Sequence, residues 1–437
     1  MMNRGLAWMS CVMILASLCL AQGISPSVIG GSAPAGPRPA DTVEEASVRM
    51  TDTAVAADVR SLTAGSNAFA FNLYAQLAQA KGNLFFSPGS IDIALAMTYT
   101  GARGATAEQM AKTLHLDLAG DKLGPAAAAL MKELNNPPEI AGKKAYQLSV
   151  ANALWGQKGY AFLPQFTANL KENFQAPLEQ VDFGQAEQAA KTINDWVAGQ
   201  TNDKIKDLVP AAALSSVTRL VLTNAVYFKS EWANQFKKGA TKDAPFKPSP
   251  GESVDVPMMH QTSHVGYVEN DDLQAIEMSY KGRVLSMVIF LPKKTDGLAA
   301  MEKTLTAASV DKWLKDVPRE EVHIALPRFK TTSQFELGKT LTAMGMTDAF
   351  GGSADFSGMT GKRDVFISAV IHKAFVDVDE NGTEAAAATA VMMAMSAMPG
   401  PRAEPKQFIA DHPFVFLIRH NDTGEILFIG RVANPKE

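Results

Sequence analysis

Cysteine is nearly absent from this chain of 437 residues. Its two cysteines, Cys11 and Cys19, both lie in the apolar segment Gly5–Leu20, so a chain without that segment has neither disulfide nor thiol chemistry. An excess of one charge is missing as well, because 41 Lys and Arg residues are balanced by 45 Asp and Glu residues. Such a balance gives no electrostatic attraction to nucleic acid or to an anionic membrane surface. We therefore expect neither as a partner.

The sequence also lacks a recognisable catalytic motif. The nearest match to Gly-x-Ser-x-Gly, at Gly351–Asp355, has no final glycine for the tight turn. Ser309 and Lys312 fit Ser-x-x-Lys, but so short a pattern arises by chance, and no Lys-Thr-Gly accompanies it. His260 and His264 have the i, i+4 spacing of a helical metal site, yet their neighbours predict strand and turn. We expect a protein that is not an enzyme and uses no metal or cofactor.

The N-terminal region predicts export. Residues 1–23 run from Arg4 through the apolar segment to Ala21 and Gly23, which is the layout of a secretory signal peptide. The apolar segment is shorter than the roughly 20 residues that a membrane-spanning helix needs. We expect a secreted or extracytoplasmic protein, periplasmic if the source is a Gram-negative bacterium. Residues 24–61 are rich in Pro, Gly and Ala and predict a flexible tether, which leaves a folded domain over residues 62–437.

Within that domain, helical and strand patterns alternate irregularly and predict a mixed α+β fold. Ser66 is a candidate N-cap for a first helix that ends before Gly82, and Thr106 with Gln109 has the spacing of a capping box. Further helices are predicted at residues 88–99, 126–134, 186–199 and 334–344. Strands are predicted at residues 83–86, 147–155, 220–228, 284–291, 322–329 and 365–379, with a hairpin of strands 414–419 and 426–431.

The stretch Gly382–Met398 has an unusual composition. After Glu384 it carries no charge until Arg402, and it consists mostly of Ala, Thr and Met. It is too short to cross a membrane and too apolar for an ordinary solvated linker. In an extended conformation its small residues would alternate between two faces, and no unpaired charge would be buried if one face entered a protein core.

Several motifs, taken together and in order, resemble one protein family. They are Asn83–Ser90, Thr223-Asn224 followed by Phe228 and Trp232, Pro327–Phe329, Asp355–Gly358, Ile371–Lys373, Glu380–Thr389 and His412–Phe416. On these residues the chain resembles the serpins, a family of serine protease inhibitors, over nearly all of Ser61–Pro435. The resemblance implies a multi-sheet fold of three β-sheets and eight or nine helices, with an exposed reactive loop at about residues 380–407.

The resemblance also assigns roles to particular residues. It implies a polar cluster, the shutter, beneath the point where the main sheet opens, formed by Ser87, Ser90, Asn224 and His372. It implies a hinge at the start of the loop, which comprises Glu380, Gly382, Thr383, Glu384, Ala385, Ala386, Ala387, Ala388 and Thr389. A protease that cleaves such a loop is trapped as an acyl-enzyme when the loop inserts into the sheet. After Glu384 the hinge lacks the bulky or charged residues of family members that act as carriers, chaperones or storage proteins, which are the alternative.

The position of the scissile bond remains open between two counts. Counting forward from Gly382 by the family's usual spacing gives Ser396-Ala397, whereas counting backward from Pro413 gives about Arg402. A cut at or near Ser396, including Met395 and Met398, suits proteases of elastase, subtilisin or chymotrypsin type. A cut at Arg402 suits a trypsin-like enzyme. The predicted helix 126–134 has only one basic residue, so we expect no heparin activation, and we expect a monomer.

Overall fold

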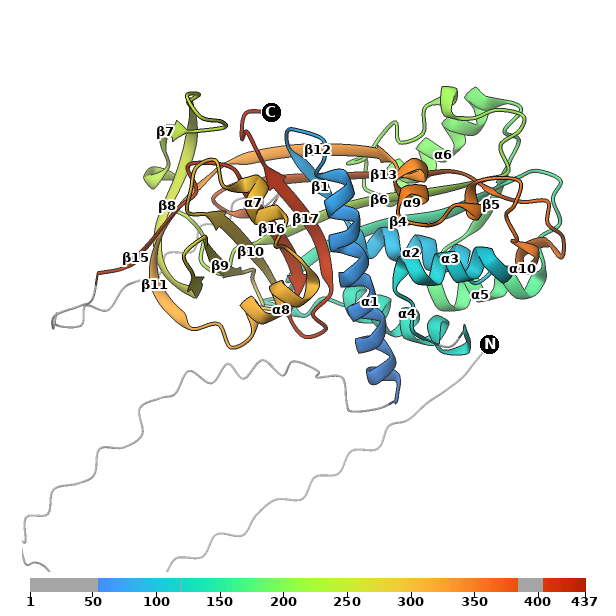
Figure 1. Cartoon of the computed structure of the whole chain (residues 1–437), viewed down its shortest axis with the longest axis horizontal. Helices are drawn as coiled ribbons and strands as arrows, with labels where there is room; N and C mark the ends of the chain where they lie inside the picture. The colour runs from blue at the N-terminus through green and yellow to red at the C-terminus, as the bar shows by residue number, and fades with distance from the viewer. Residues whose placement is uncertain (1–53, 119, 384–403) are drawn as a thin grey trace, which may run out of the picture. The chain divides into compact units, whose positions relative to one another are not determined.

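The computed structural model describes residues 54–118, 120–383 and 404–437 (Figure 1). The predicted signal peptide, most of the predicted tether and the candidate scissile bonds at Met395, Ser396, Ala397, Met398 and Arg402 lie outside the described residues. The hinge is described only through Thr383, so Glu384, Ala385, Ala386, Ala387, Ala388 and Thr389 also lie outside them. No helix within the described ranges is both long and apolar enough to span a membrane.

The first helix begins earlier than we predicted. Helix α1 spans Ala54–Leu77, so residues 54–61, which we assigned to the tether, form its first turns. Ala-rich segments favour helix, and Val59 and Leu62 are buried in the core, which stabilises this extension. Ser66 is therefore not an N-cap. It lies inside the helix, where it is 2% exposed.

Nine strands form one sheet in the order β1-β17-β16-β10-β9-β8-β11-β15, with β7 paired to β8 (Figure 1). The hairpin of β16 and β17 is antiparallel, as the sequence predicted, and lies between the edge strand β1 and β10. In chain order the strands are β1 (Leu84–Phe86), β7 (Lys242–Phe246), β8 (Val254–Glu269), β9 (Leu273–Ser279), β10 (Leu285–Pro292), β11 (Arg319–Pro327), β15 (Lys406–Ile409), β16 (Phe414–His420) and β17 (Ile426–Val432).

A second sheet has six strands in the order β12-β13-β14-β6-β4-β5, and a short hairpin, β2 with β3, makes a third. Strands β13 and β6 are parallel and pair directly over most of their length. At one end they are separated by the two residues of β14, which is antiparallel to both. The strands are β2 (Glu139–Ile140), β3 (Lys143–Lys144), β4 (Tyr146–Gln157), β5 (Leu178–Val181), β6 (Leu220–Glu231), β12 (Phe329–Glu336), β13 (Ile367–Val378) and β14 (Gly382–Thr383).

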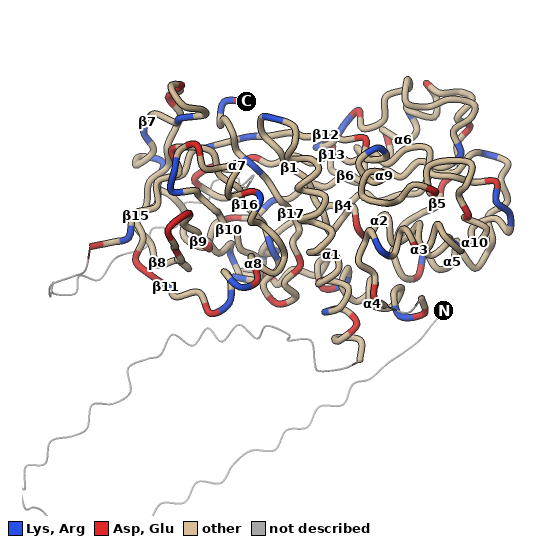
Figure 2. The backbone as a smooth tube through the Cα atoms, in the orientation of Figure 1, with Lys and Arg blue, Asp and Glu red and all other residues tan. Residues whose placement is uncertain are grey.

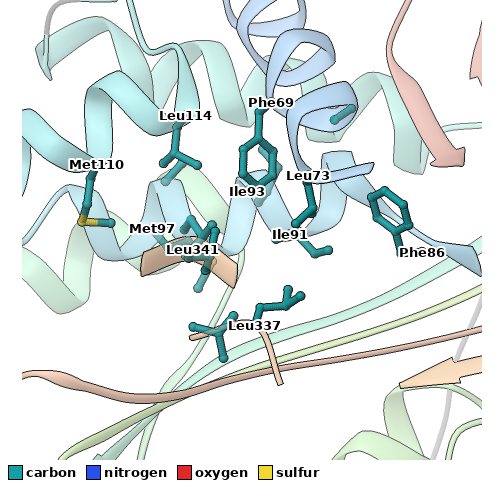
Figure 3. Close-up of a cluster of buried hydrophobic side chains, with 14 of the residues drawn as sticks. Phe69, Leu73, Phe86, Ile91, Ile93, Met97, Met110, Leu114, Leu337 and Leu341 are labelled. Carbon is teal, nitrogen blue, oxygen red and sulfur yellow. The ribbon is translucent and has the colours of Figure 1, made fainter. Parts of the chain in front are cut away.

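Helix α2 is buried around almost its whole circumference between α1 and the sheets. Every residue of α2 except Tyr99 is buried, and Pro88 begins it without the loss of a needed backbone donor. Apolar side chains from α1, α2, α3 and α9 meet beneath the six-stranded sheet (Figure 3). The remaining helices are α2 (Pro88–Tyr99), α3 (Gly104–Leu114), α4 (Gly120–Asn135), α5 (Pro164–Phe174), α6 (Ala186–Gln200), α7 (Leu298–Glu302), α8 (Ala307–Leu314), α9 (Gly338–Ala343) and α10 (Ser357–Thr360).

Two local predictions were wrong. The pair Thr106 and Gln109 does not cap α3, because both side chains accept hydrogen bonds from distant backbone, at Asp355 (2.9 Å) and Asp348 (2.8 Å). The predicted helix at residues 334–344 begins as the end of β12 and becomes helical only at Gly338. The mixed fold with three sheets is confirmed, and the described residues contain ten α-helices, where we had expected eight or nine.

Candidate functional site

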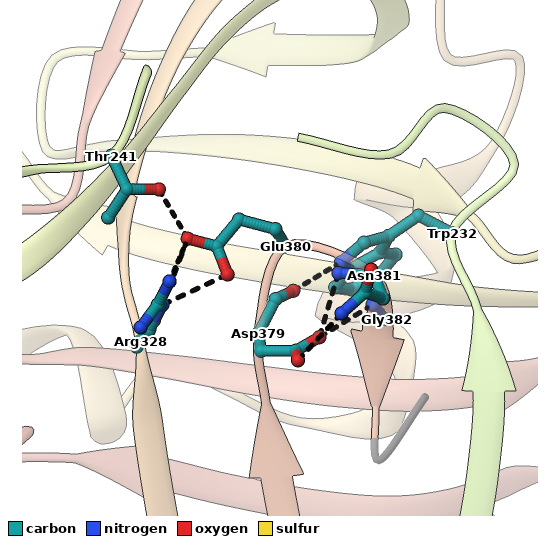
Figure 4. A network of polar contacts seen from close by, with 7 residues as sticks. All are labelled: Trp232, Thr241, Arg328, Asp379, Glu380, Asn381 and Gly382. Carbon is teal, nitrogen blue, oxygen red and sulfur yellow. Dashed lines mark hydrogen bonds and ion pairs between the residues drawn. The ribbon is translucent and has the colours of Figure 1, made fainter. Parts of the chain in front are cut away.

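The hinge begins at a tight turn between β13 and β14 (Figure 4). The carboxylate of Asp379 accepts hydrogen bonds from the backbone N–H groups of Asn381 (2.7 Å) and Gly382 (3.2 Å). Trp232, just beyond β6, donates its backbone N–H to the carbonyl of Asn381 (2.8 Å) and its indole N–H to that of Asp379 (3.0 Å). These bonds fix the direction in which the chain leaves β13 and turns back into the sheet.

Glu380 anchors the outer side of this turn. Its side chain is only 1% exposed, and its carboxylate accepts hydrogen bonds from the Arg328 Nε at 2.9 and 3.0 Å and from the hydroxyl of Thr241 (Figure 4). Burial alone would raise the pKa of Glu380, but the bonds from Arg328 and Thr241 outweigh it and hold the pKa below its usual value. The Glu380 carboxylate thus ties the turn to Arg328, which lies between β11 and β12, and to Thr241, which precedes β7.

Gly382 and Thr383 already lie inside the six-stranded sheet, between β13 and β6. Gly382 has φ of +155°, and a Cβ at this position would lie 2.1 Å from the carbonyl oxygen of Ser230, so a larger residue cannot fit without movement. Thr383 is fully buried, and its hydroxyl shares a hydrogen bond of 2.7 Å with the hydroxyl of Tyr280. Gly382 and Thr383 therefore form the start of an inserted strand.

The predicted shutter residues converge below this point. His372 on β13 lies opposite Asn224 on β6, and its Nδ1 donates to the Asn224 Oδ1 over 2.5 Å. Its Nε2 accepts the backbone N–H of Ser87 (3.2 Å), which requires the neutral tautomer with hydrogen on Nδ1. Asn224 donates its amide to the hydroxyl of Ser90 over 2.6 Å. All four predicted residues thus belong to one buried network between α2 and the sheet.

The network includes Asn152, which we did not predict. Asn152 on β4 faces Asn224 directly, accepts from Asn224 and Ser90, and returns its amide to the carbonyl of Ser90 (3.3 Å). Its place inside a strand of buried residues was the available signal. Burial lowers the pKa of His372 to about 3, so the imidazole is uncharged at neutral pH. The network therefore joins α2, β4, β6 and β13 through neutral groups alone.

The residues that match short catalytic or metal-site patterns in the sequence make other contacts in the structure. Ser309 forms a reciprocal capping box with Thr306 at the start of α8. His260 lies on β8, and its ring stacks on that of His323 with centroids 5.7 Å apart, not on a helix with His264. Among the residues that the structure describes, no three His, Cys, Asp or Glu side chains converge to hold a metal ion.

Charges of both signs are interspersed along the chain in Figure 2. Helix α4 begins six residues before the predicted helix and so includes Lys122 as well as Lys132. Lys122 forms an ion pair of 3.1 Å with Asp58 of α1. The cation that the longer helix adds is therefore partly neutralised.

Comparison with known proteins agrees with this geometry. The family model for serpins (serine protease inhibitors) matches residues 64–435. The chain belongs to the serpin family. It is 41% identical over its full length to all of an uncharacterized serpin-like protein of Thermococcus kodakarensis. It is also 42% identical to the leukocyte elastase inhibitor of Xenopus tropicalis, over 86% of this chain and 100% of that protein. The crystal structure of human thyroxine-binding globulin is similar, with a TM-score of 0.79 and 30% identity over 87% of this chain and 100% of that one.

Proposed function

We propose that this protein is a secreted suicide-substrate inhibitor of serine endopeptidases. The observation that carries the proposal is the position of Gly382 and Thr383 between β13 and β6. A protease that cleaves the loop beyond Thr383 forms an acyl-enzyme, and the freed N-terminal part of the loop then continues β14 into the sheet. The protease remains attached to the inserted strand and is carried away from the geometry that hydrolysis needs.

The sheet topology supplies a driving force for this step. The parallel ladder between β13 and β6 is a single ladder, whereas a strand inserted between them would form an antiparallel ladder on each side. Each inserted residue therefore adds about one net backbone hydrogen bond, worth about 1 kcal/mol. Over about ten residues the gain is on the order of 10 kcal/mol, comparable with the whole stability of a typical domain.

The target class is inferred from the loop and from the relatives. The Xenopus tropicalis relative is named as an inhibitor of leukocyte elastase. A scissile bond at Ser396-Ala397 fits the small apolar pocket of an elastase-type protease, and a bond beside Met395 or Met398 also fits subtilisin or chymotrypsin types. The predicted signal peptide would deliver the inhibitor to an extracytoplasmic compartment where such proteases act.

The proposal is tested by incubation with a panel of serine and cysteine proteases. We expect a covalent complex that survives denaturing electrophoresis with at least one protease of elastase, subtilisin or chymotrypsin type. Mass spectrometry of the released C-terminal peptide then identifies the scissile bond. Cleavage of the loop should also raise the melting temperature markedly. Absence of any complex, together with an unchanged melting temperature after cleavage, would favour a carrier, chaperone or storage protein instead.

Thr383→Arg separates insertion from simple substrate behaviour. The side chain at this position is fully buried, so arginine would place an unpaired charge in the sheet and block insertion. The variant should be cleaved as a substrate without complex formation. Thr332→Arg is the matched control, since Thr332 is exposed on β12 of the same sheet, and it should still form the complex. A stable complex with Thr383→Arg would refute loop insertion.

A further inference from the structure

Two carboxyl groups are buried where α1, α2 and β17 meet, outside the hinge and the shutter. One is Asp92 on α2, and the other is Glu425, the residue just before β17. Each is 1% exposed. The hydroxyl of Ser66 on α1 donates to the Glu425 Oε1 over 2.7 Å. In the described part of the chain, the Asp92 Oδ1 and the Glu425 Oε2 have no hydrogen-bond partner. An ionised carboxylate is costly in such a place unless a cation or several donors compensate it.

The contact surface is shaped around these groups. A Cβ on Gly89 would lie 2.5 Å from the Glu425 Oε1, so only glycine lets α2 approach the carboxyl so closely. Asp92 follows Gly89 by three residues and therefore lies on the same side of α2. Glu425 also borders a cavity whose lining includes Ser87, Ser90 and Asn152. Asp92 thus lies on the same helix as Ser90, and Ser87 is the residue that precedes this helix.

Within the described ranges, no cation on the neighbouring elements compensates the pair. The facing residues of α1 are Thr63, Ser66 and Asn67, which carry no charge. The titratable or charged groups on the other packed elements are Lys132 and Glu133 of α4, Arg419 and His420 of β16, and Asp422 of the hairpin turn. None of these groups shifts the pKa of Asp92 or of Glu425. Among the described residues, Glu425 is the charged group that acts on Asp92, and it raises the pKa of Asp92 after burial has done so.

We propose that Asp92 and Glu425 form a buried proton-binding site that holds α2 against α1 and β17 while it carries a proton. A carboxyl that carries a proton is neutral and gains a hydrogen-bond donor, so its burial costs much less than that of a carboxylate. When both are ionised, two buried negative charges repel each other and the contact loosens. Because α2 also carries Ser90, which is bonded to Asn152 and Asn224, loss of the proton is transmitted to the six-stranded sheet. The site makes the native state sensitive to pH independently of any inhibitory function.

The direction of titration agrees with this role. Burial raises the pKa of Glu425 to about 7, and the hydroxyl groups on α1 offset only part of that rise. Burial, together with the charge of Glu425, raises the pKa of Asp92 well above its usual value. A carboxyl with a raised pKa in the folded state stabilises that state at low pH, and the stabilisation is lost as the pH rises through the folded-state value. The native protein should therefore lose stability between about pH 5 and pH 8.

Urea unfolding at pH 5 and pH 8 tests the site, with Glu425→Gln beside the unaltered protein. We divide the unfolding equilibrium constant of the unaltered protein by that of Glu425→Gln. This ratio should rise roughly 50-fold from pH 5 to pH 8, because only the unaltered protein loses the proton at Glu425. Asp422→Asn is the matched control, since it removes an exposed carboxyl from the same hairpin, and it should follow the unaltered protein. An unchanged ratio for Glu425→Gln would overturn the proposal.

Infrared spectroscopy of the unaltered protein gives a readout that does not depend on how the variants fold. At pH 6 we expect carbonyl bands of protonated buried carboxyls, one of which is missing in Glu425→Gln. Absence of such bands in the unaltered protein would refute the proton site.

Urea unfolding at pH 8 with added sodium, potassium or calcium chloride is the third experiment. If one of these salts restores stability in the unaltered protein but not in Glu425→Gln, the site binds a metal cation and the proposal is wrong.

Discussion

Replacement of Arg328 by alanine should weaken the end of the six-stranded sheet where β14 lies between β13 and β6. Arg328 holds the carboxylate of Glu380, which is 1% exposed, at the turn that leads into β14. Loss of one partner from a fully buried pair costs about 3–5 kcal/mol, whereas an exposed pair contributes less than about 1 kcal/mol. The Arg328 side chain is 43% exposed, so water can partly replace it. We therefore expect a loss of about 2 kcal/mol in the free energy of unfolding.

Urea unfolding at pH 7, followed by tryptophan fluorescence, measures this loss. Trp232 is a local reporter, because it stacks on Tyr280 with ring centroids 4.6 Å apart and donates to the turn. Lys330→Ala is the matched control, since Lys330 lies two residues further along the chain, on β12. Lys330 pairs with Asp377 over 3.5 Å, but both side chains are well exposed, so its removal should cost less than about 0.5 kcal/mol.

The pH dependence gives a second, independent check on Arg328→Ala. The pKa of Glu380 lies below its usual value of 4.5, so the pair stabilises the fold above that pH and the contribution disappears as the pH falls through the folded-state pKa. The difference between the unaltered protein and Arg328→Ala should therefore shrink in acid. Equal losses in Arg328→Ala and Lys330→Ala at pH 7, or a difference that does not change with pH, would refute the role assigned to Glu380.

Three further outcomes are expected at the hinge and the shutter. Gly382→Ala should expel β14 and speed cleavage of the hinge in limited proteolysis, because its Cβ would clash with Ser230; Gly239→Ala, with open space at its Cβ, should not. Asn152→Ala should cost about 1–3 kcal/mol in urea unfolding, since it leaves Asn224 short of an acceptor. His372→Asn should flatten the stability loss below pH 6.5: a pKa lowered to about 3 means that the unfolded chain takes up the proton first as the pH falls.

Six of the longer strands could be predicted because they are rich in apolar and β-branched residues. Strands β4, β6, β10, β13, β16 and β17 all lie within a few residues of the predicted ranges. The start of α1 was missed because the charged and small residues before Leu62 have no strong local signal, and packing in the core decides their state. Residues Gln334–Glu336 looked helical in isolation, yet they belong to β12 because they pair with β13.

The candidate site could be predicted only where a family motif marks it. The shutter residues Ser87, Ser90, Asn224 and His372 were found by resemblance, and the structure brings them together. Asn152 and Tyr280 have no comparable motif, since their roles come from partners far away in sequence. The pairing of Arg328 with Glu380 likewise depends on register between strands, which local patterns do not determine.

The register of β14 also dictates where a lengthening strand would meet the shutter. Val378 pairs with Thr383, so each residue back along β13 meets one residue further along the loop, and His372 would meet Thr389. The same count along β6, where Ser230 pairs with Thr383, brings Thr389 to Asn224. The counts along β13 and β6 thus place Thr389 at the same position. There the imidazole of His372 now donates to the amide oxygen of Asn224. A threonine hydroxyl arriving there is both donor and acceptor, so it can take over both ends of the bond that its arrival breaks.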